Sequence, residues 1–214
     1  MNIVITGANR GIGARLADMY RAGGHHVIGT SRAADADYPL DVRQPESHAA
    51  FADKLGAQAI DLLVCNAGVY LDRGQDLASG YDVALWQDAF AVNVTGVFLS
   101  VQSLLPHLSR SKAPKIAIIS SQMASHTRAP GGSYIYRSSK AAVLNLGRNL
   151  ASDLRAQGVP VGIYHPGWVQ TDMGGAAADI DVDQSAQGLM ARFDALSLET
   201  TGVFETWDGR AHPY

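Results

Sequence analysis

The sequence contains a single cysteine, Cys65, so the chain cannot form an internal disulfide. A lone thiol of this kind is typical of a reducing compartment, and we expect a cytoplasmic location. An excess of charge is also lacking, because basic and acidic residues nearly balance at a formal net charge of −3. The chain therefore has no basic surplus that would attract nucleic acid or an anionic membrane, and we expect neither as a partner.

The sequence also shows no pattern of a targeting segment or of a repeat. The first residues show no basic region followed by an apolar stretch and a small-residue cleavage site, so we expect no leader. No uninterrupted apolar stretch reaches membrane-spanning length. The seven histidines lack the spacing of metal ligands, so we expect no metal site. No repeat or linker marks a boundary, and a hydrophobic content of 47% suits one folded domain over residues 1–214.

Short apolar runs alternate with segments of helical periodicity along the whole chain. The expected strands are 2–6, 26–30, 62–66, 115–120, 161–164 and 203–206, with a further short strand at 38–42. The expected helices are 12–21, 45–55, 82–108, 137–157 and 185–196. Such alternation produces right-handed βαβ units, and continuous apolar runs suit strands that are covered on both faces. We predict a single doubly wound α/β (Rossmann) domain with a seven-stranded, mostly parallel sheet between two helix layers.

Three glycines follow the first expected strand in the segment TGANRGIG, directly before a helical pattern. Gly7 permits a tight turn, Gly11 lets a pyrophosphate approach the main chain, and Gly13 lets the helix pack on the sheet. The free N–H groups of that helix terminus would favour an anion. A turn without a ligand is the alternative, but the place in the first βα unit favours a dinucleotide. The other loop residues expected to contact it are Asn9, Arg10 and Ile12.

The end of the second expected strand carries no carboxylate. NAD sites commonly have an acidic residue there for the ribose 2′-hydroxyl, whereas this chain has Ser31 followed by Arg32. Together with Arg10, these residues suit a 2′-phosphate, because guanidinium binds phosphate through two parallel hydrogen bonds. Two solvated surface arginines are the alternative. We predict NADP(H) in preference to NAD(H), with Asp41 and Val42 at the edge of the adenine.

Tyr136 and Lys140 are four residues apart and share one helix face near the end of the strand at 115–120. A phenol with a pKa of about 10 is a poor acid at neutral pH. A neighbouring ammonium group should lower that pKa toward the working range. Ser121 follows the strand end and can hydrogen-bond a substrate oxygen. Asn93 is a polar residue in an apolar helical stretch, where it could relieve a kink or hold a water that links Lys140 to solvent.

Six segments in one order resemble the short-chain dehydrogenase/reductase family over the whole chain. They are TGANRGIG, NAG at 66–68, NVTG at 93–96, ISS at 119–121, YRSSK at 136–140 and PGWVQT at 166–171. The resemblance implies a catalytic tetrad in which Tyr136 transfers the proton and Ser121 steadies the carbonyl oxygen. Its other two members are Asn93 and Lys140. Besides Tyr136 and Lys140, the cofactor contacts expected on these segments are Asn66, Ala67, Gly68, Pro166, Gly167, Val169 and Thr171.

The chain departs from the family pattern in three places. Cys65 replaces the first asparagine of Asn-Asn-Ala-Gly, which removes a side-chain bond expected at that strand end. Ser121 lies 15 residues before Tyr136, where the family usually has 13. Tyr134 has the usual spacing, but position 138 is serine and offers it no ammonium partner, so we keep Tyr136. The segment between positions 171 and 185, where the family's substrate lid lies, is short, so we expect an open or small pocket.

The tail segments HPGWVQTDMGG and GVFETWDGRAHPY resemble the C-factor-like, carbonyl-reductase-like subgroup. We predict an oxidoreductase that uses NADP(H) and transfers a hydride between nicotinamide and a small carbonyl or secondary alcohol substrate. A nucleotide-binding signalling or regulatory protein of C-factor type is the alternative, and the intact tetrad argues against it. An enoyl-type reductase is disfavoured, because it usually has a wider Tyr-to-Lys gap. The two long apolar helices pair across a two-fold axis in related proteins, which implies a homodimer or homotetramer.

Overall fold

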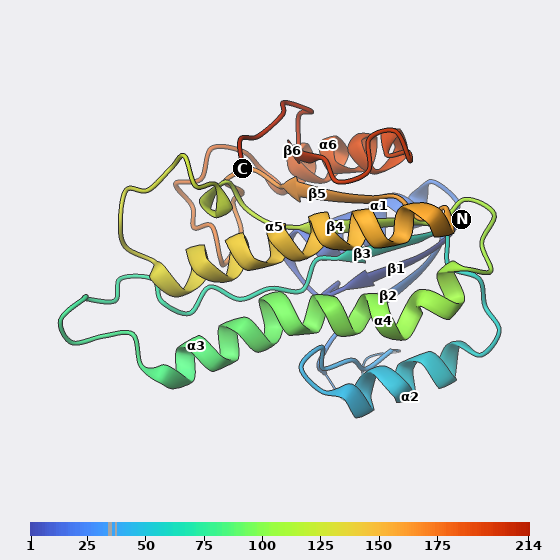
Figure 1. Ribbon diagram of the computed structural model, residues 1–214, viewed down its shortest axis with the longest axis horizontal. Coiled ribbons are helices and arrows are strands. Elements are labelled where there is room, and N and C mark those ends of the chain that lie inside the picture. Colours follow the sequence, from blue (N-terminus) through green and yellow to red (C-terminus); the bar gives the residue numbers. More distant parts are fainter. Residues whose placement is uncertain (34–35, 37) are drawn as a thin grey trace.

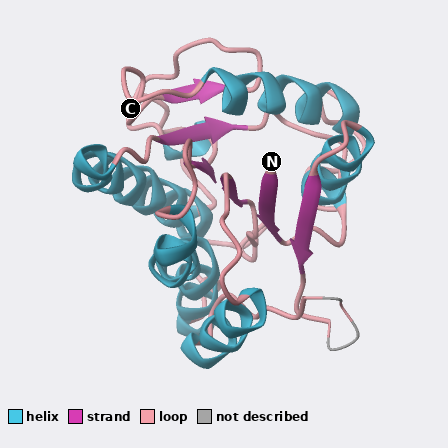
Figure 2. Ribbon diagram, turned by 90° about the vertical axis from the view of Figure 1, so that its right-hand side faces the viewer, coloured by secondary structure: helices cyan, strands magenta, loops and turns pink. Residues whose placement is uncertain are grey.

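The computed structural model describes residues 1–33, 36 and 38–214, and within them one parallel sheet has helices on both faces (Figures 1 and 2). The strands are β1 (Asn2–Thr6), β2 (His26–Thr30), β3 (Leu62–Cys65), β4 (Lys115–Ile119), β5 (Val161–His165) and β6 (Phe204–Thr206). Their order is β2-β1-β3-β4-β5-β6, and every neighbouring pair is parallel. The direction of winding reverses between β1 and β3, which is where doubly wound sheets open a crevice for ligands.

Among the described residues the sheet has six strands, so the predicted seventh strand is wrong. The segment at 38–42 makes only an isolated bridge, between Ser31 and Pro39. Pro39 has no N–H to donate, so a regular ladder cannot continue through it. Leu40 and Val42 are buried in the core with Phe51 instead.

The helices form two layers. On one face lie α1 (Gly11–Ala22) and α6 (Val182–Ala195), and on the other lie α2 (Pro45–Leu55), α4 (Gly96–Leu108) and α5 (Tyr134–Leu154) (Figure 1). Successive strand residues point to opposite faces, so Ile3 and Ile5 pack under α1 while Val4 joins the other core cluster. This two-sided burial explains why the strands are continuous apolar runs.

Residues 83–108 form one long helical rod. It consists of α3 (Val83–Phe90), a π-helical turn (Ala91–Thr95) and α4. Among the described residues, this helix is long and apolar enough to cross a membrane, with a mean hydropathy of 1.5, which the sequence analysis did not expect. Its side chains Val97, Val101 and Leu104 are buried in the core of the α/β fold. The apolar composition is therefore explained by packing on the sheet.

Two helices begin three residues earlier than predicted. For α6 the reason is a capping box, in which Asp181 accepts from the main chain of Gln184 and the Gln184 side chain reciprocates. The early start of α5 at Tyr134 depends on a residue in the loop after β3, which is described with the candidate active site below.

Candidate active site

The loops after β1 and β3 meet closely enough to require glycine. Gly7 and Gly11 have φ of 66° and 56°, which L side chains rarely adopt. A Cβ on Gly7 would lie 3.0 Å from the Cα of Ala67, and a Cβ on Gly13 would lie 2.4 Å from the Gly7 carbonyl oxygen. Among the described residues no side chain caps the N-terminus of α1, and its own first turn contains no acidic residue. Its N–H groups therefore remain available to an anion, as a dinucleotide pyrophosphate requires.

Asn66 connects the loop after β3 to the loop after β1 through hydrogen bonds. Its Nδ2 donates to the carbonyl oxygens of Thr6 and Gly7, both at 3.0 Å. The Thr6 hydroxyl oxygen in turn accepts from the main chain of Asn66 at 3.0 Å and of Ala67 at 3.1 Å. Neighbouring Cys65 is buried, and burial raises the pKa of its thiol to about 12. The asparagine amide thus holds the glycine turn in place, a role the sequence analysis did not assign to it.

The residues expected near the adenosine lie at the end of β2. Arg32 is exposed, and the Ser31 hydroxyl accepts from the main chain of Ala33 at 3.3 Å. Asp41 forms a salt bridge of 2.7 Å with Arg43, and this bonding holds the pKa of the carboxyl below its usual range. Arg43 was not among the residues predicted from the sequence. An arginine two residues after the aspartate was the available signal.

Arg10 leans toward the opposite loop. Its guanidinium pairs with Asp172 at 2.7 Å, and both side chains are exposed. Gly11 lies beside Thr171, whose methyl carbon would be 3.5 Å from an added Cβ. The segment after β5 folds back on itself through a bridge between Val169 and Ile180. The glycine-rich loop and the segment of predicted cofactor contacts at 166–171 therefore lie next to each other.

Tyr136, Lys140 and Ser121 come together at the end of β4. The ammonium nitrogen of Lys140 is 5.7 Å from the centroid of the Tyr136 ring and donates to the Ile119 carbonyl at 3.0 Å. Ser121 lies close enough to Tyr136 to lower the pKa of its phenol, and the Ser121 hydroxyl accepts from the main chain of Met123 at 3.1 Å. The longer spacing between Ser121 and Tyr136 thus does not separate them.

The net pKa shift of Tyr136 is opposite to the one expected from its lysine neighbour. Burial raises the pKa to about 12 and outweighs the Ser121 hydrogen bond and the Arg73 charge, which lower it. Burial also lowers the pKa of Lys140 to about 8, because desolvation disfavours the ammonium form. The expectation of a lowered phenol pKa is therefore wrong for this structure: desolvation dominates both groups.

A distant aspartate caps the helix that carries Tyr136. Asp72 is fully buried, and its carboxylate accepts from the main chain of Ile135 at 2.8 Å and of Tyr136 at 3.2 Å. Ser133, directly before α5, has a φ of 49° and makes no side-chain cap. The loop after β3 thus fixes the first turn of α5, which explains the early start of this helix.

The same loop supplies one wall of the site. Tyr70 stacks on Tyr136 with ring centroids 4.3 Å apart and an interplanar angle of 21°, and its hydroxyl hydrogen-bonds that of Ser133. Arg73 lies 5.0 Å over the Tyr70 ring and donates to the carbonyl of Met173. These contacts tie the loop after β3 to α5 and to the segment after β5. Neither Tyr70 nor Arg73 was among the site residues predicted from the sequence.

Asn93 lies in the π-helical turn, almost fully buried. Its Nδ2 donates to the Val69 carbonyl at 2.9 Å and to the Ser139 hydroxyl at 3.0 Å, and its Oδ1 accepts from the Val69 main chain at 2.9 Å. A Cβ on Gly68 would lie 3.4 Å from Asn93 Oδ1 and 3.5 Å from Lys140 Nζ, so both groups adjoin this glycine. Asn93 therefore anchors the loop after β3 beside Lys140.

A family model described as short chain dehydrogenase matches residues 1–180. The chain belongs to the short-chain dehydrogenase family. This confirms the identification made from the sequence motifs.

Named relatives of this short-chain dehydrogenase fall into two groups. C-signal from Myxococcus xanthus is 35% identical over 167 residues, covering 77% of this chain and 99% of that protein. The 3-oxoacyl-acyl-carrier-protein reductase FabG from Escherichia coli (strain K12) is 30% identical over 207 residues, 90% of this chain and 81% of the relative. A carbonyl reductase from chicken fatty liver, solved with NADPH bound, matches with a TM-score of 0.91 at 27% identity and covers 100% of this chain and 98% of the other. The similarity therefore extends to carbonyl-reductase-like and C-factor-like members.

Proposed function

We propose that this protein is an NADP(H)-dependent oxidoreductase that interconverts a small carbonyl compound and its alcohol. The observation that carries the proposal is the meeting of Tyr136, Ser121 and Lys140 at the strand edge beside the glycine-rich loop. When bound, the nicotinamide supplies the hydride that a carbonyl carbon accepts in reduction. The protein then has to position the carbonyl and deliver one proton to its oxygen.

Tyr136 is suited to the proton-donating half of this reaction. A pKa of about 12 keeps the phenol protonated at neutral pH, so it can give a proton to the alkoxide that develops as the carbonyl is reduced. Ser121 would hydrogen-bond the same oxygen and stabilise its charge. Lys140, with a pKa lowered to about 8, is able to exchange protons near neutral pH and so to reprotonate the phenol. Holding a water between Lys140 and solvent stays a proposed role for Asn93.

The cofactor would occupy the edge formed by the loops after β1, β2, β3 and β5. The uncapped N-terminus of α1 suits the pyrophosphate, and Arg32 suits a 2′-phosphate beside the neutral Ser31, with Arg10 able to join it on release from Asp172. The relative from chicken is named as an NADPH complex, which supports the same cofactor here. Preference for NADP(H) over NAD(H) is part of the proposal.

A signalling role is the second candidate function. The observation in its favour is the match to C-signal, which extends over 99% of that protein. In this case the chain would bind the dinucleotide with little or no turnover. The buried Tyr136 and Lys140 favour catalysis, because a binding module has no need to desolvate both groups side by side.

We also propose that the chain forms a homodimer or homotetramer in the cytoplasm. In support, α4 and α5 lie side by side on one face of the sheet (Figure 1), and Phe98 of α4 leaves 41% of its surface exposed. Two-fold pairing of these helices would cover that ring.

Consumption of NADPH with a panel of aldehydes and ketones tests the proposed enzyme. Tyr136→Phe should reduce turnover by at least about a hundredfold, because it removes the proton donor. Tyr134→Phe is the matched control: it removes a partly exposed phenol two residues away and should retain activity. Equal rates in wild type and Tyr136→Phe would overturn the catalytic role, and NADPH binding without turnover of any compound would favour the signalling role.

A further inference from the structure

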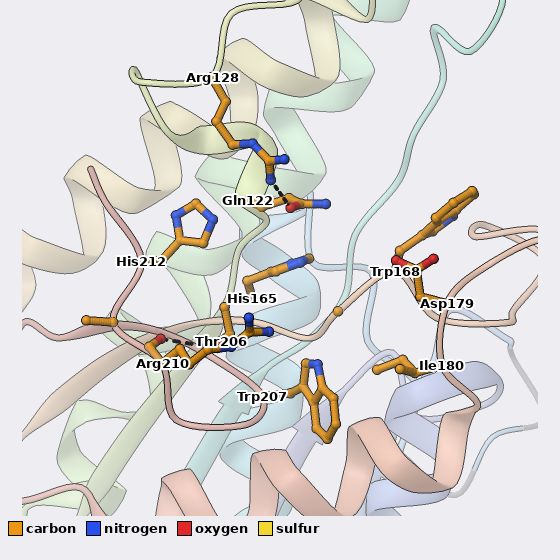
Figure 3. Close-up of a pocket in the computed structure, with 12 residues that line it drawn as sticks. Gln122, Arg128, His165, Trp168, Asp179, Ile180, Thr206, Trp207, Arg210 and His212 are labelled. Carbon is orange, nitrogen blue, oxygen red and sulfur yellow. Dashed lines mark hydrogen bonds between the residues drawn. The ribbon is translucent and has the colours of Figure 1, made fainter.

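A cavity of about 330 Å³ lies beside the proposed reaction site, at the carboxyl ends of β5 and β6 (Figure 3). Its lining includes Gln122, which directly follows Ser121, and Trp168, which follows the predicted cofactor contacts at 166–167. The volume is that of a site for a small organic molecule. The site assigned above does not use the residues that form its polar side.

The polar side of the cavity centres on His165, the last residue of β5. The ring is 7% exposed, lines the cavity, and has its Nδ1 buried without a hydrogen-bond partner (Figure 3). An unpaired buried N–H costs more than an unpaired acceptor, which favours the tautomer with the proton on Nε2. The Nε2–H at the far edge of this cavity-lining ring then has no hydrogen-bond partner among the residues that the structure describes.

Arg128 and Arg210 line the same cavity as this ring. Burial lowers the pKa of His165 to about 3, and His212, Arg128 and Arg210 lower it further, while Asp208 opposes them. Asp208 is engaged, since it pairs with Arg210 at 2.8 Å and accepts from the Thr206 hydroxyl. The histidine is therefore a neutral donor in a basic environment.

Arg128 provides the second donor. Its guanidinium donates to the side-chain oxygen of Gln122, a neutral group, and no carboxylate pairs with it among the residues that the structure describes (Figure 3). Asp179 lies by Trp168 on the opposite wall, where Ile180 and Trp207 add apolar surface (Figure 3). The cavity thus has a basic end and a largely apolar wall.

We propose that this cavity binds a small organic carboxylate, with Arg128 and the Nε2–H of His165 on its oxygens and its apolar body against Trp168 and Trp207. A guanidinium and an imidazole N–H are strong donors to a carboxylate, and the tryptophan rings exclude water from the ligand's body. The acid is either the end of an acidic carbonyl substrate, which rests on the function proposed above, or a separate small acid bound next to the reaction site.

Calorimetric titration with benzoate tests the site directly and needs no turnover. Benzoate should bind the wild type, and Arg128→Gln should weaken binding at least about tenfold, because a charge-assisted hydrogen bond is lost. His165→Phe should weaken it as well. Arg110→Gln is the matched control, since it removes the same charge from an exposed residue after α4 and should leave binding unchanged. Benzamide, which has the same shape without the charge, should bind more weakly than benzoate.

Two results would overturn the proposal: no benzoate binding to the folded wild type, or equal binding by wild type and Arg128→Gln. Arg128 is exposed, so Arg128→Gln should fold and stays informative even if His165→Phe does not fold.

Inhibition of benzaldehyde reduction by benzoate then distinguishes the two sources of the carboxylate, an acidic carbonyl substrate and a separate small acid. Competitive inhibition assigns the carboxylate to the substrate, and non-competitive inhibition assigns it to a separate acid; both support the site. If the protein turned over none of the aldehydes and ketones in the panel, the proposed enzyme would be refuted, whereas the calorimetric evidence for benzoate binding would still stand.

Discussion

The carboxylate of Asp72 accepts a hydrogen bond from the main-chain nitrogen of Tyr136, although 64 residues separate them. A capping interaction that is usually local is here supplied by another loop. The proposed proton donor therefore depends on the segment after β3 for its position. A substitution of Asp72 should therefore change both the free energy of unfolding and the activity.

Replacing Asp72 by alanine should lower both stability and turnover. The substitution leaves the N–H groups of Ile135 and Tyr136 unpaired in a buried place, at a cost of about 2 kcal/mol in the free energy of unfolding. Turnover should fall in the protein that remains folded, because the first turn of α5 loosens. Urea unfolding and steady-state kinetics measure the two effects.

Asp82→Ala is the control for this prediction. Asp82 caps α3 by accepting from the main chain of Ala84 at 2.7 Å, in an exposed position. Its loss should cost about 1 kcal/mol and leave turnover unchanged. If both variants lost turnover equally, the link between Asp72 and Tyr136 would be refuted.

Lys140 should make the protein more stable as the pH rises from about 8 to about 10.5. Below pH 8 the amine is protonated in both states, whereas between the two values the unfolded chain binds more protons than the folded one. The full gain is on the order of 3 kcal/mol. The unfolding free energy of wild type minus that of Lys140→Met, measured across this range, isolates the contribution, and a flat difference would contradict it.

Arg32→Asp should weaken NADPH binding by tenfold or more and NADH binding far less. The substitution removes a guanidinium that suits the 2′-phosphate and places a carboxylate near it. Fluorescence titration with both cofactors gives the two affinities, with Arg110→Asp as the control for net charge. A parallel change in both affinities would show that Arg32 does not read the phosphate.

Cys65 should resist thiol reagents in the folded protein. Burial raises its pKa to about 12, so almost no thiolate is present at pH 8, and the buried sulfur is out of reach. Ellman's reagent should label one thiol per chain in urea and almost none without it. Rapid labelling of the native protein would mean that the end of β3 opens readily.

The sequence predicted those parts of the fold whose signals are local. The limits of β2 at 26–30 and α2 at 45–55 agree with the structure, because turn residues and Pro45 mark them in the chain itself. The expected strand at 38–42 failed because Pro39 cannot donate to a ladder, although its neighbours are apolar and buried. The four-residue spacing placed Tyr136 and Lys140 on one helix face, and both lie in α5 in the structure.

Apart from Arg43, which pairs with nearby Asp41, the features missed from the sequence involve partners far apart in the chain. Asp72 and Tyr70 meet α5 only after the loop following β3 has folded over it, and no local pattern announces such a contact. The pKa of Tyr136 depends on how much surface the fold removes from water, which spacing to Lys140 does not reveal. His165 stands in a strand-end motif, but its basic surroundings come from the chain's last turns and from Arg128.

The stacking of Tyr70 on Tyr136 also bears on stereochemistry. With one face of the phenol ring covered and the Tyr70 hydroxyl tied to Ser133, a ketone at Tyr136 has to direct its bulkier substituent away from that covered side. The two prochiral faces of the carbonyl are then no longer equivalent. Reduction of an unsymmetrical ketone should therefore give one alcohol enantiomer in excess, and a smaller side chain at position 70 should erode that excess.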